Sequence, residues 1–258
     1  AAPPSCGASV VGPAAAAVLN AVGGFRAPFW VMAVFLALLI PTAWKARSDT
    51  AEKDVTRQKL SDLLRNRKLI GACSVVSAYF VFIGAFESVW ILDMDHRGAS
   101  QWQIGVTVTC VALPIAVLAP WGGSLAQRYG SRRWALAMIT ACSIFNALFG
   151  LVPGLWALVF LTVGCGFAEG IGFPSGTMLV SSSVPESRQA AAQGLASAIE
   201  VGTAALAALG LAVVYTTVGH TVAYLVASGA MLVLLSVGWK LTIGIGGPES
   251  KMIESSAK

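Results

Sequence analysis

The chain has 258 residues, of which 56% are hydrophobic and only 11% are charged, and its formal net charge at pH 7 is +5. The basic residues lie between long apolar stretches, so their excess indicates membrane topology and contact with anionic headgroups and gives no argument for nucleic-acid binding.

Eight apolar stretches of membrane-spanning length follow one another along the chain. Each has about 17–29 residues, enough for a helix to cross a hydrocarbon core of about 30 Å. They lack the alternation of barrel strands, so we predict helices, which satisfy all backbone hydrogen bonds within lipid. The predicted fold class is all-α, a polytopic membrane helical bundle with spans at 8–24, 28–45, 69–92, 102–122, 134–151, 155–179, 189–217 and 221–240.

The basic residues gather on one side of these spans. The odd-numbered connections hold only Arg26 and Arg97, and the other fifteen of the seventeen Lys and Arg residues lie on the opposite side. Such an excess marks the cytoplasmic side, so we expect a plasma (inner) membrane protein with a cytoplasmic C-terminus. Tryptophan prefers the membrane–water interface. A soluble helical core would not require tryptophans at span ends. All eight tryptophans lie at or near the ends of the predicted spans: Trp30, Trp44, Trp90, Trp102, Trp121, Trp134, Trp156 and Trp239.

The cysteines and the start of the chain give weaker information. The chain starts at Ala1 without a basic segment or cleavage site before the first span, so we expect a piece of a longer protein and no signal peptide. The five cysteines occur singly, without metal or disulfide spacing, and we interpret them as small buried residues, with no cofactor and no metal: Cys6, Cys73, Cys110, Cys142 and Cys165.

A weak internal repeat predicts how the chain is divided. Residues 7–45, moved forward by 195 positions, match Gly24 to Gly219 and Trp44 to Trp239, among eight identities. Transporters built from two repeats show such similarity. We therefore predict the last two helices of an incomplete N-terminal bundle at 1–45, a cytoplasmic interdomain loop at 46–68, a complete six-helix C-terminal bundle at 69–242 and a cytoplasmic tail at 243–258. The interdomain loop is open to two interpretations, an amphipathic surface helix or a solvated linker.

A glycine- and arginine-containing segment separates the fourth and fifth spans. It reads Gly-Ser-Leu-Ala-Gln-Arg-Tyr-Gly-Ser-Arg-Arg over residues 123–133. This segment resembles the cytoplasmic loop motif of the major facilitator superfamily, Gly-x-Leu-Ala-Asp-Arg-x-Gly-Arg-Lys, although Gln127 replaces its aspartate. We expect the glycines to let two helix ends pack around a tight turn and the arginines to keep it cytoplasmic, with a gating role also open. The residues in question are Gly123, Arg128, Gly130, Arg132 and Arg133.

Two further segments resemble the same family, and their order along the chain agrees with it. Gly12 and Pro13 are similar to the fifth-helix motif of its drug:proton antiporters, with alanines in place of the flanking glycines. Gly164, Gly166, Gly170 and Pro174 resemble its tenth helix, and the Gly166–Gly170 spacing favours close helix contact over a phosphate loop. The resemblance implies that the chain corresponds to helices five to twelve of a twelve-helix transporter.

Three glutamates lie inside predicted spans. A charge at bilayer depth costs about 2.5–3.5 kcal/mol, so each carboxyl should face a cavity, pair with another group or take up a proton. The resemblance places these spans at cavity-lining helices, whereas the peripheral ones have no charge in their interiors. We therefore predict proton-coupling or substrate-cavity roles for Glu169, Glu200 and Glu87, with structural pairing for Glu169 and a wetted vestibule position for Glu87 as alternatives.

These observations favour a secondary active transporter that moves a small organic solute by alternating access, coupled to protons and directed outward. Expected partners are the lipid bilayer, the solute, protons and the missing N-terminal helices. An uptake permease for a sugar or metabolite and a non-transporting sensor or assembly subunit are alternatives. An enzyme is disfavoured because His96 and His220, the two histidines, lie at outer loops without metal or base spacing.

Overall fold

The structure is a computed structural model, and it describes residues 26, 30–35, 37–38 and 60–245. The chain divides into two compact units, Ala1–Leu60 and Ser61–Lys258. In the first unit, residues 30–35 and 37–38 are helical, within the span predicted at 28–45. The span predicted at 8–24, with Gly12 and Pro13, lies outside the described residues, as do most of the interdomain loop and the tail.

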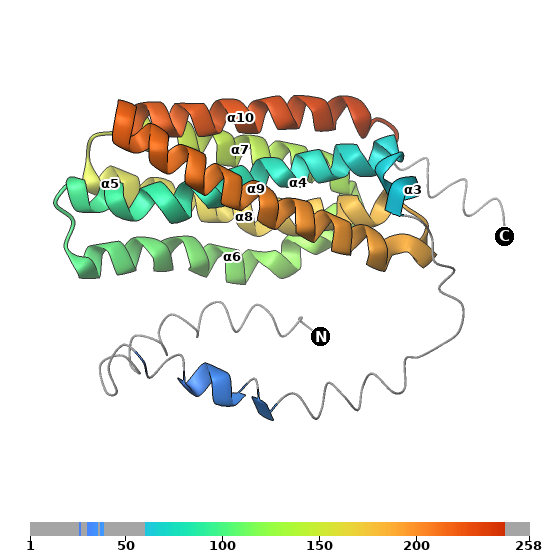
Figure 1. Ribbon diagram of the computed structural model, residues 1–258, viewed down its shortest axis with the longest axis horizontal. Coiled ribbons are helices and arrows are strands. Elements are labelled where there is room, and N and C mark those ends of the chain that lie inside the picture. Colours follow the sequence, from blue (N-terminus) through green and yellow to red (C-terminus); the bar gives the residue numbers. More distant parts are fainter. Residues whose placement is uncertain (1–25, 27–29, 36, 39–59, 246–258) are drawn as a thin grey trace. The chain divides into compact units, whose positions relative to one another are not determined.

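The second unit is a bundle of helices (Figure 1). Six stretches of its described residues are long and apolar enough to cross a membrane, and no strand occurs among them, so the all-α prediction is confirmed. The first of these stretches combines three helical segments. In chain order the elements are α3 (Leu60–Leu64), α4 (Arg67–Ala85), the π-helical turn η1 (Phe86–Trp90), α5 (Ile91–His96), α6 (Gln101–Tyr129), α7 (Ser131–Leu151), α8 (Leu155–Ser182), the 3-10 turn η2 (Glu186–Arg188), α9 (Gln189–Val218) and α10 (His220–Leu241).

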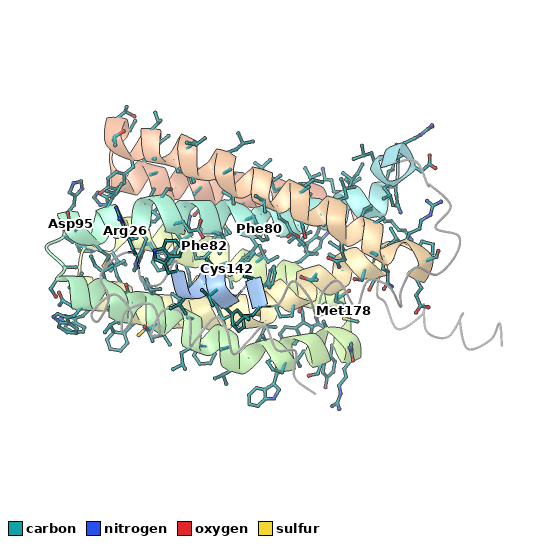
Figure 2. All side chains as sticks on the ribbon, turned by 60° about the horizontal axis from the view of Figure 1, so that its bottom comes forward. Arg26, Phe80, Phe82, Asp95, Cys142 and Met178 are labelled. Carbon is teal, nitrogen blue, oxygen red and sulfur yellow. The ribbon has the colours of Figure 1, made fainter. Side chains whose placement is uncertain are left out.

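Short turns connect the six membrane-length stretches, so consecutive ones run antiparallel. The start of α4 therefore shares one end of the bundle with the α6–α7 and α8–α9 turns and the end of α10, and Asp95 lies at the opposite end (Figure 2). Eight of the described Lys and Arg residues of this unit gather at the first end, which we call the basic end: Arg65, Arg67, Lys68, Arg128, Arg132, Arg133, Arg188 and Lys240.

Close backbone contacts hold α6 against α8. A Cβ atom on Gly166 would lie 2.6 Å from the carbonyl oxygen of Val111, and one on Gly122 would lie 2.7 Å from that of Gly170. Pro174 has no N–H to donate to Gly170 O, four residues earlier, so Gly122 packs over a carbonyl that the helix leaves free. In lipid, where apolar side chains gain little by associating, such small-residue contacts supply much of the helix packing.

Polar side chains fasten α10 to its two neighbours, α4 and α7. Ser74 on α4 donates a hydrogen bond of 2.8 Å to the carbonyl oxygen of Leu234. The amide nitrogen of Asn146 on α7 donates to the carbonyl oxygen of Tyr224 and to Ser228 Oγ, at 3.1 and 3.0 Å. These donors thereby find acceptors inside the protein, as hydrocarbon surroundings favour, whereas Oδ1 of Asn146 is buried without a hydrogen-bond partner among the described residues.

The structure corrects the expected loop between the fourth and fifth spans. Residues 123–129 are the last two turns of α6, and Gly130, with φ +98°, is the only non-helical residue before α7. Leu, Ala and Gln favour the helix, so it continues where the apolar stretch ends. Gly130 makes the expected turn. The expected close packing at Gly123 is wrong within the described residues, since no neighbour lies within 4 Å of a Cβ atom there.

A second correction concerns the tryptophans. Trp102, Trp156 and Trp239 are exposed near helix ends, as an interfacial position requires, and Trp121 is exposed about two turns before the end of α6. Trp90 is instead fully buried, stacks on Phe86 and donates a 3.1 Å hydrogen bond to Thr107 Oγ1. The end of the apolar stretch is not the end of the helix here, because α5 continues the span to His96.

We predict that Gly166→Ala destabilises the full-length protein by about 1–3 kcal/mol, because the new methyl group meets the backbone of Val111. Gly229→Ala is the matched control, since a Cβ atom there meets no described atom within 4 Å and alanine favours the helix by about 1 kcal/mol. Unfolding in detergent measures both. Equal stabilities of the two variants would contradict the close contact between α6 and α8.

Candidate functional site

Glu169 is the most deeply buried of the three glutamates. It lies in α8, is 1% exposed, and accepts a 2.8 Å hydrogen bond at Oε2 from the hydroxyl of Tyr79 on α4. The thiol of Cys165, one helical turn earlier, donates to Oε1 at 3.6 Å. No described Lys, Arg or His forms a salt bridge with it. Its carboxyl group is therefore paired through neutral donors, one of the alternatives that the sequence left open.

Aromatic rings pack around the ring of Tyr79, the residue whose hydroxyl reaches Glu169. The ring of Tyr79 lies 5.5 Å from that of Phe80, 6.3 Å from that of Phe82 and 5.4 Å from that of Phe173, between centroids. Tyr79 and Phe82 are buried, whereas Phe173 is 38% exposed and Phe80 is half-buried. Figure 2 shows Phe80 and Phe82 on α4 near the middle of the bundle. The Tyr79–Glu169 pair is thus shielded from the surface by a layer of rings.

The other two glutamates lie in wetter positions. Glu200 on α9 is half-buried. Glu87 is exposed on η1, the π-helical turn in the first span. Among the described residues, no hydrogen bond or salt bridge joins either carboxylate to Glu169. The structure therefore does not gather the three acids into one cluster.

The arginines at the α6–α7 turn have different environments. Arg132 donates to Thr242 Oγ1 and to the carbonyl oxygen of Trp239, each at 3.0 Å, and its guanidinium lies 5.3 Å from the Trp239 ring centroid. Arg128 and Arg133 are exposed. Arg132 thus connects the start of α7 to the end of α10. This structural contact is additional to the effect of its charge on membrane topology.

A polar network at the end opposite the basic end was missed in the sequence. Arg97 pairs with the buried Asp93 at 3.0 Å and donates to the carbonyl oxygens of Val152 and Phe149 at 2.7 and 3.3 Å. The hydroxyl of Tyr224 on α10 approaches the same aspartate at 3.4 Å. The i, i+4 spacing of Asp93 and Arg97 was the available signal. This network joins α5 to the ends of α7 and α10.

Beside this network, His96 stacks on Tyr215 of α9 and its Nδ1 lies 2.6 Å from the tyrosine hydroxyl. The histidine is thus engaged in helix packing. Within the described residues there is no group of three or more His, Cys, Asp or Glu side chains placed to hold a metal ion. At the bundle centre, the described residues place the buried carboxyl group of Glu169 against two neutral donors, Tyr79 and Cys165.

The profile of the Major Facilitator Superfamily matches residues 69–252 of this chain. The chain is 29% identical over 140 residues to the multidrug resistance protein MdtG of Dickeya zeae, covering 53% of this chain and 34% of that protein. It is 27% identical over 152 residues to the probable sulfoacetate transporter SauU of Cupriavidus necator, covering 58% and 34%. It is also 27% identical over 115 residues to the multi-drug resistance efflux pump PmrA of Streptococcus pneumoniae, covering 43% and 29%. The matched region is about a third of each relative's length.

We predict that Asp93→Ala destabilises the full-length protein by about 3–5 kcal/mol, because it leaves the charge of Arg97 without its carboxylate in a buried site. Asp95→Ala, which removes an exposed carboxylate two residues away, changes stability by less than about 0.5 kcal/mol. Thermal unfolding of both variants measures the difference. Similar losses in the two variants would show that the network does not hold this end together.

Proposed function

We propose that this chain, which belongs to the Major Facilitator Superfamily, is part of a secondary transporter that exports a small organic solute in exchange for protons. The two multidrug proteins among its relatives support export, and the bundle of six membrane-length helices supports the transporter architecture. The proposed localisation is the plasma (inner) membrane, with the basic end in the cytoplasm. The six helices act with N-terminal helices that complete the second bundle of the transporter.

The buried carboxyl group of Glu169 carries the coupling proposal. No cation among the described residues neutralises it, and its two donors only partly replace the water that it gives up on burial. A proton is therefore the species that can remove its charge. A carboxyl group that is neutral in one conformation and ionised in another makes the conformational equilibrium respond to protons.

The hydrogen bond between Tyr79 and Glu169 would couple protonation of Glu169 to a conformational change of the bundle. Tyr79 is on α4, which packs mainly on α9 and α10, whereas Glu169 is on α8, which packs mainly on α6 and α7. The bond thus joins two parts of the bundle at its centre. We propose that protonation of Glu169 weakens this bond and that the rearrangement accompanies the rocking of the two bundles during alternating access.

The proposed solute is an apolar or cationic amphiphile. Phe80 and Phe173 present partly exposed rings beside Tyr79, the partner of Glu169, and aromatic faces and carboxylates both attract cations. The relation to a probable sulfoacetate transporter favours uptake of a metabolite as the second candidate. An anion would be repelled by an ionised Glu169, which makes this candidate the weaker one. The third candidate, a sensor or assembly subunit, would need neither solute flux nor a carboxyl group that exchanges a proton, so the buried Glu169 does not favour it.

We predict that Glu169→Gln abolishes proton movement driven by solute while leaving the protein folded, since the amide still accepts from Tyr79 but cannot exchange a proton. Full-length protein in liposomes with an internal pH dye, given ethidium as the probe, provides the measurement. Glu186→Gln, at an exposed carboxylate in the basic-end turn, is the matched control. We expect the loss of proton movement to follow the order of burial. It should be largest in Glu169→Gln, smaller in Glu200→Gln and smallest in Glu87→Gln.

Unchanged proton movement in Glu169→Gln would remove this residue from the coupling mechanism. If the unaltered protein moves neither ethidium nor tetraphenylphosphonium under a pH gradient of either sign, export of cationic amphiphiles is wrong. Flux of sulfoacetate under the same conditions would then favour the second candidate.

We further predict that Tyr79→Phe lowers the rate of coupled transport by about tenfold, because it removes the 2.8 Å bond at the bundle centre and little else. A charge-assisted bond of this kind contributes about 1.5–3 kcal/mol. Tyr129→Phe, at an exposed hydroxyl near the basic end, is the control. Equal rates in the two variants would show that the hydroxyl of Tyr79 has no part in coupling.

A further inference from the structure

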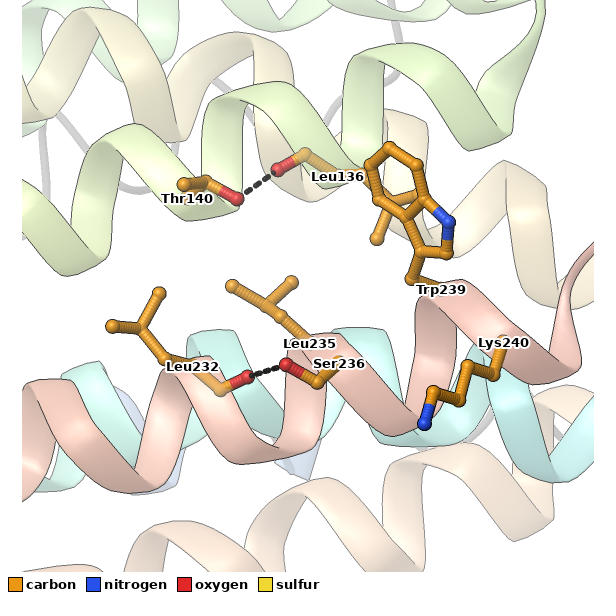
Figure 3. Close-up of a pocket in the computed structure, with 7 residues that line it drawn as sticks. All are labelled: Leu136, Thr140, Leu232, Leu235, Ser236, Trp239 and Lys240. Atoms are coloured by element: carbon orange, nitrogen blue, oxygen red, sulfur yellow. Dashed lines mark hydrogen bonds between the residues drawn. The ribbon is translucent and has the colours of Figure 1, made fainter.

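A groove runs between α7 and α10 toward the basic end of the bundle (Figure 3). It has a volume of about 310 Å³, and most of its wall is aliphatic. Thr140 and Ser236 leave room in it because their side chains are short. The residues that line it are Leu136 and Thr140 of α7 with Leu232, Leu235, Ser236, Trp239 and Lys240 of α10.

A second groove of about 300 Å³ follows the same part of α10, and the described residues that line it all belong to this helix. The two grooves share Leu232, Ser236 and Lys240, which are four residues apart and form one stripe along the helix. The second groove continues to Val233 and Val237, on the opposite side of this stripe from Leu235 and Trp239. Two apolar grooves therefore run on either side of one stripe, and both reach Lys240.

The chemistry of the grooves changes along their length. The hydroxyl of Thr140 donates a 2.7 Å hydrogen bond to Leu136 O, and that of Ser236 donates a 2.7 Å hydrogen bond to Leu232 O (Figure 3). Each hydroxyl proton is therefore already used within its own helix and does not require an acceptor from a ligand. Lys240 supplies a cation at one end, and no described carboxylate forms a salt bridge with it. Each groove is thus apolar at membrane depth and positive where it ends.

Arg132 fixes the positive end of the first groove. Its guanidinium lies 5.3 Å from the Trp239 ring centroid and donates to Trp239 O and to Thr242 Oγ1. The exposed indole of Trp239 marks the height of the membrane interface. Lys240, the next residue, therefore lies at the level of the lipid phosphates.

We propose that these two grooves bind one diacyl phospholipid with an anionic headgroup. The phosphate contacts Lys240, and one acyl chain lies in each groove, on either side of Leu232 and Ser236. One cation shared by two apolar grooves matches a ligand with one phosphate and two chains, which neither a free phosphate nor a fatty acid provides. Anionic lipids are enriched in the leaflet that faces clustered Lys and Arg residues, and the groove opens at the basic end.

Native mass spectrometry of the delipidated full-length protein tests the proposal. The probes are palmitoyl-oleoyl-phosphatidylglycerol and the phosphatidylcholine with the same chains. We expect Lys240→Gln to weaken phosphatidylglycerol binding about fivefold, the equivalent of about 1 kcal/mol for one lysine near an anionic headgroup, and to leave phosphatidylcholine unchanged. Ser236→Leu keeps the charge and fills the wall that both grooves share, so it should weaken both lipids.

Arg188→Gln is the matched control, because it removes one charge at the same end, in η2 and outside both grooves. The proposal is overturned if Arg188→Gln weakens phosphatidylglycerol as much as Lys240→Gln, since binding would then follow net charge alone. It is also overturned if Ser236→Leu leaves both lipids unchanged, or if glycerol 3-phosphate displaces the bound lipid. Size-exclusion profiles establish that each variant is folded.

Discussion

Hydrocarbon offers no hydrogen bonds, so a polar group in a membrane span is stabilised by a partner inside the bundle. Asn146 donates to backbone and hydroxyl oxygens of α10, Asp93 pairs with Arg97, and Glu169 accepts from Tyr79. The contacts of Asn146 and Glu169 each connect two helices, and Arg97 connects α5 to the end of α7 through the carbonyl oxygens of Val152 and Phe149. In lipid, apolar packing alone differs little in free energy between alternative helix arrangements. The polar contacts and the glycine contacts of α6 and α8 therefore select the observed arrangement.

The same constraint explains why Glu169 stands out. Asp93 has a cationic partner and is a structural group, whereas Glu169 has only neutral donors among the described residues. A group of this kind is costly for stability, and a gain in function is the natural reason to keep it. Its carboxyl group accepts from Tyr79 of α4, so under the proposed mechanism a change in its protonation changes the packing of the two parts of the bundle.

The two ends of the bundle are built differently. At one end the buried ion pair of Asp93 and Arg97 joins three helices, and His96 stacks on a fourth. At the basic end the cations point outward, apart from Arg132, which fastens α7 to α10. This arrangement leaves one end closed by protein contacts and the other open to anionic groups of the membrane, which is where the proposed lipid grooves end.

The sequence by itself determined the six membrane spans of the second unit, because length and apolarity decide whether a helix crosses a bilayer. It also identified Gly130 as a turn and the acids inside the spans. Only the tertiary structure decided that the motif before Gly130 is helical, that Trp90 is buried and that Asp93 pairs with Arg97. It alone separated the buried Glu169 from the exposed Glu87. Hydropathy reports how apolar a stretch is, whereas the direction of a side chain depends on which neighbouring helix it meets.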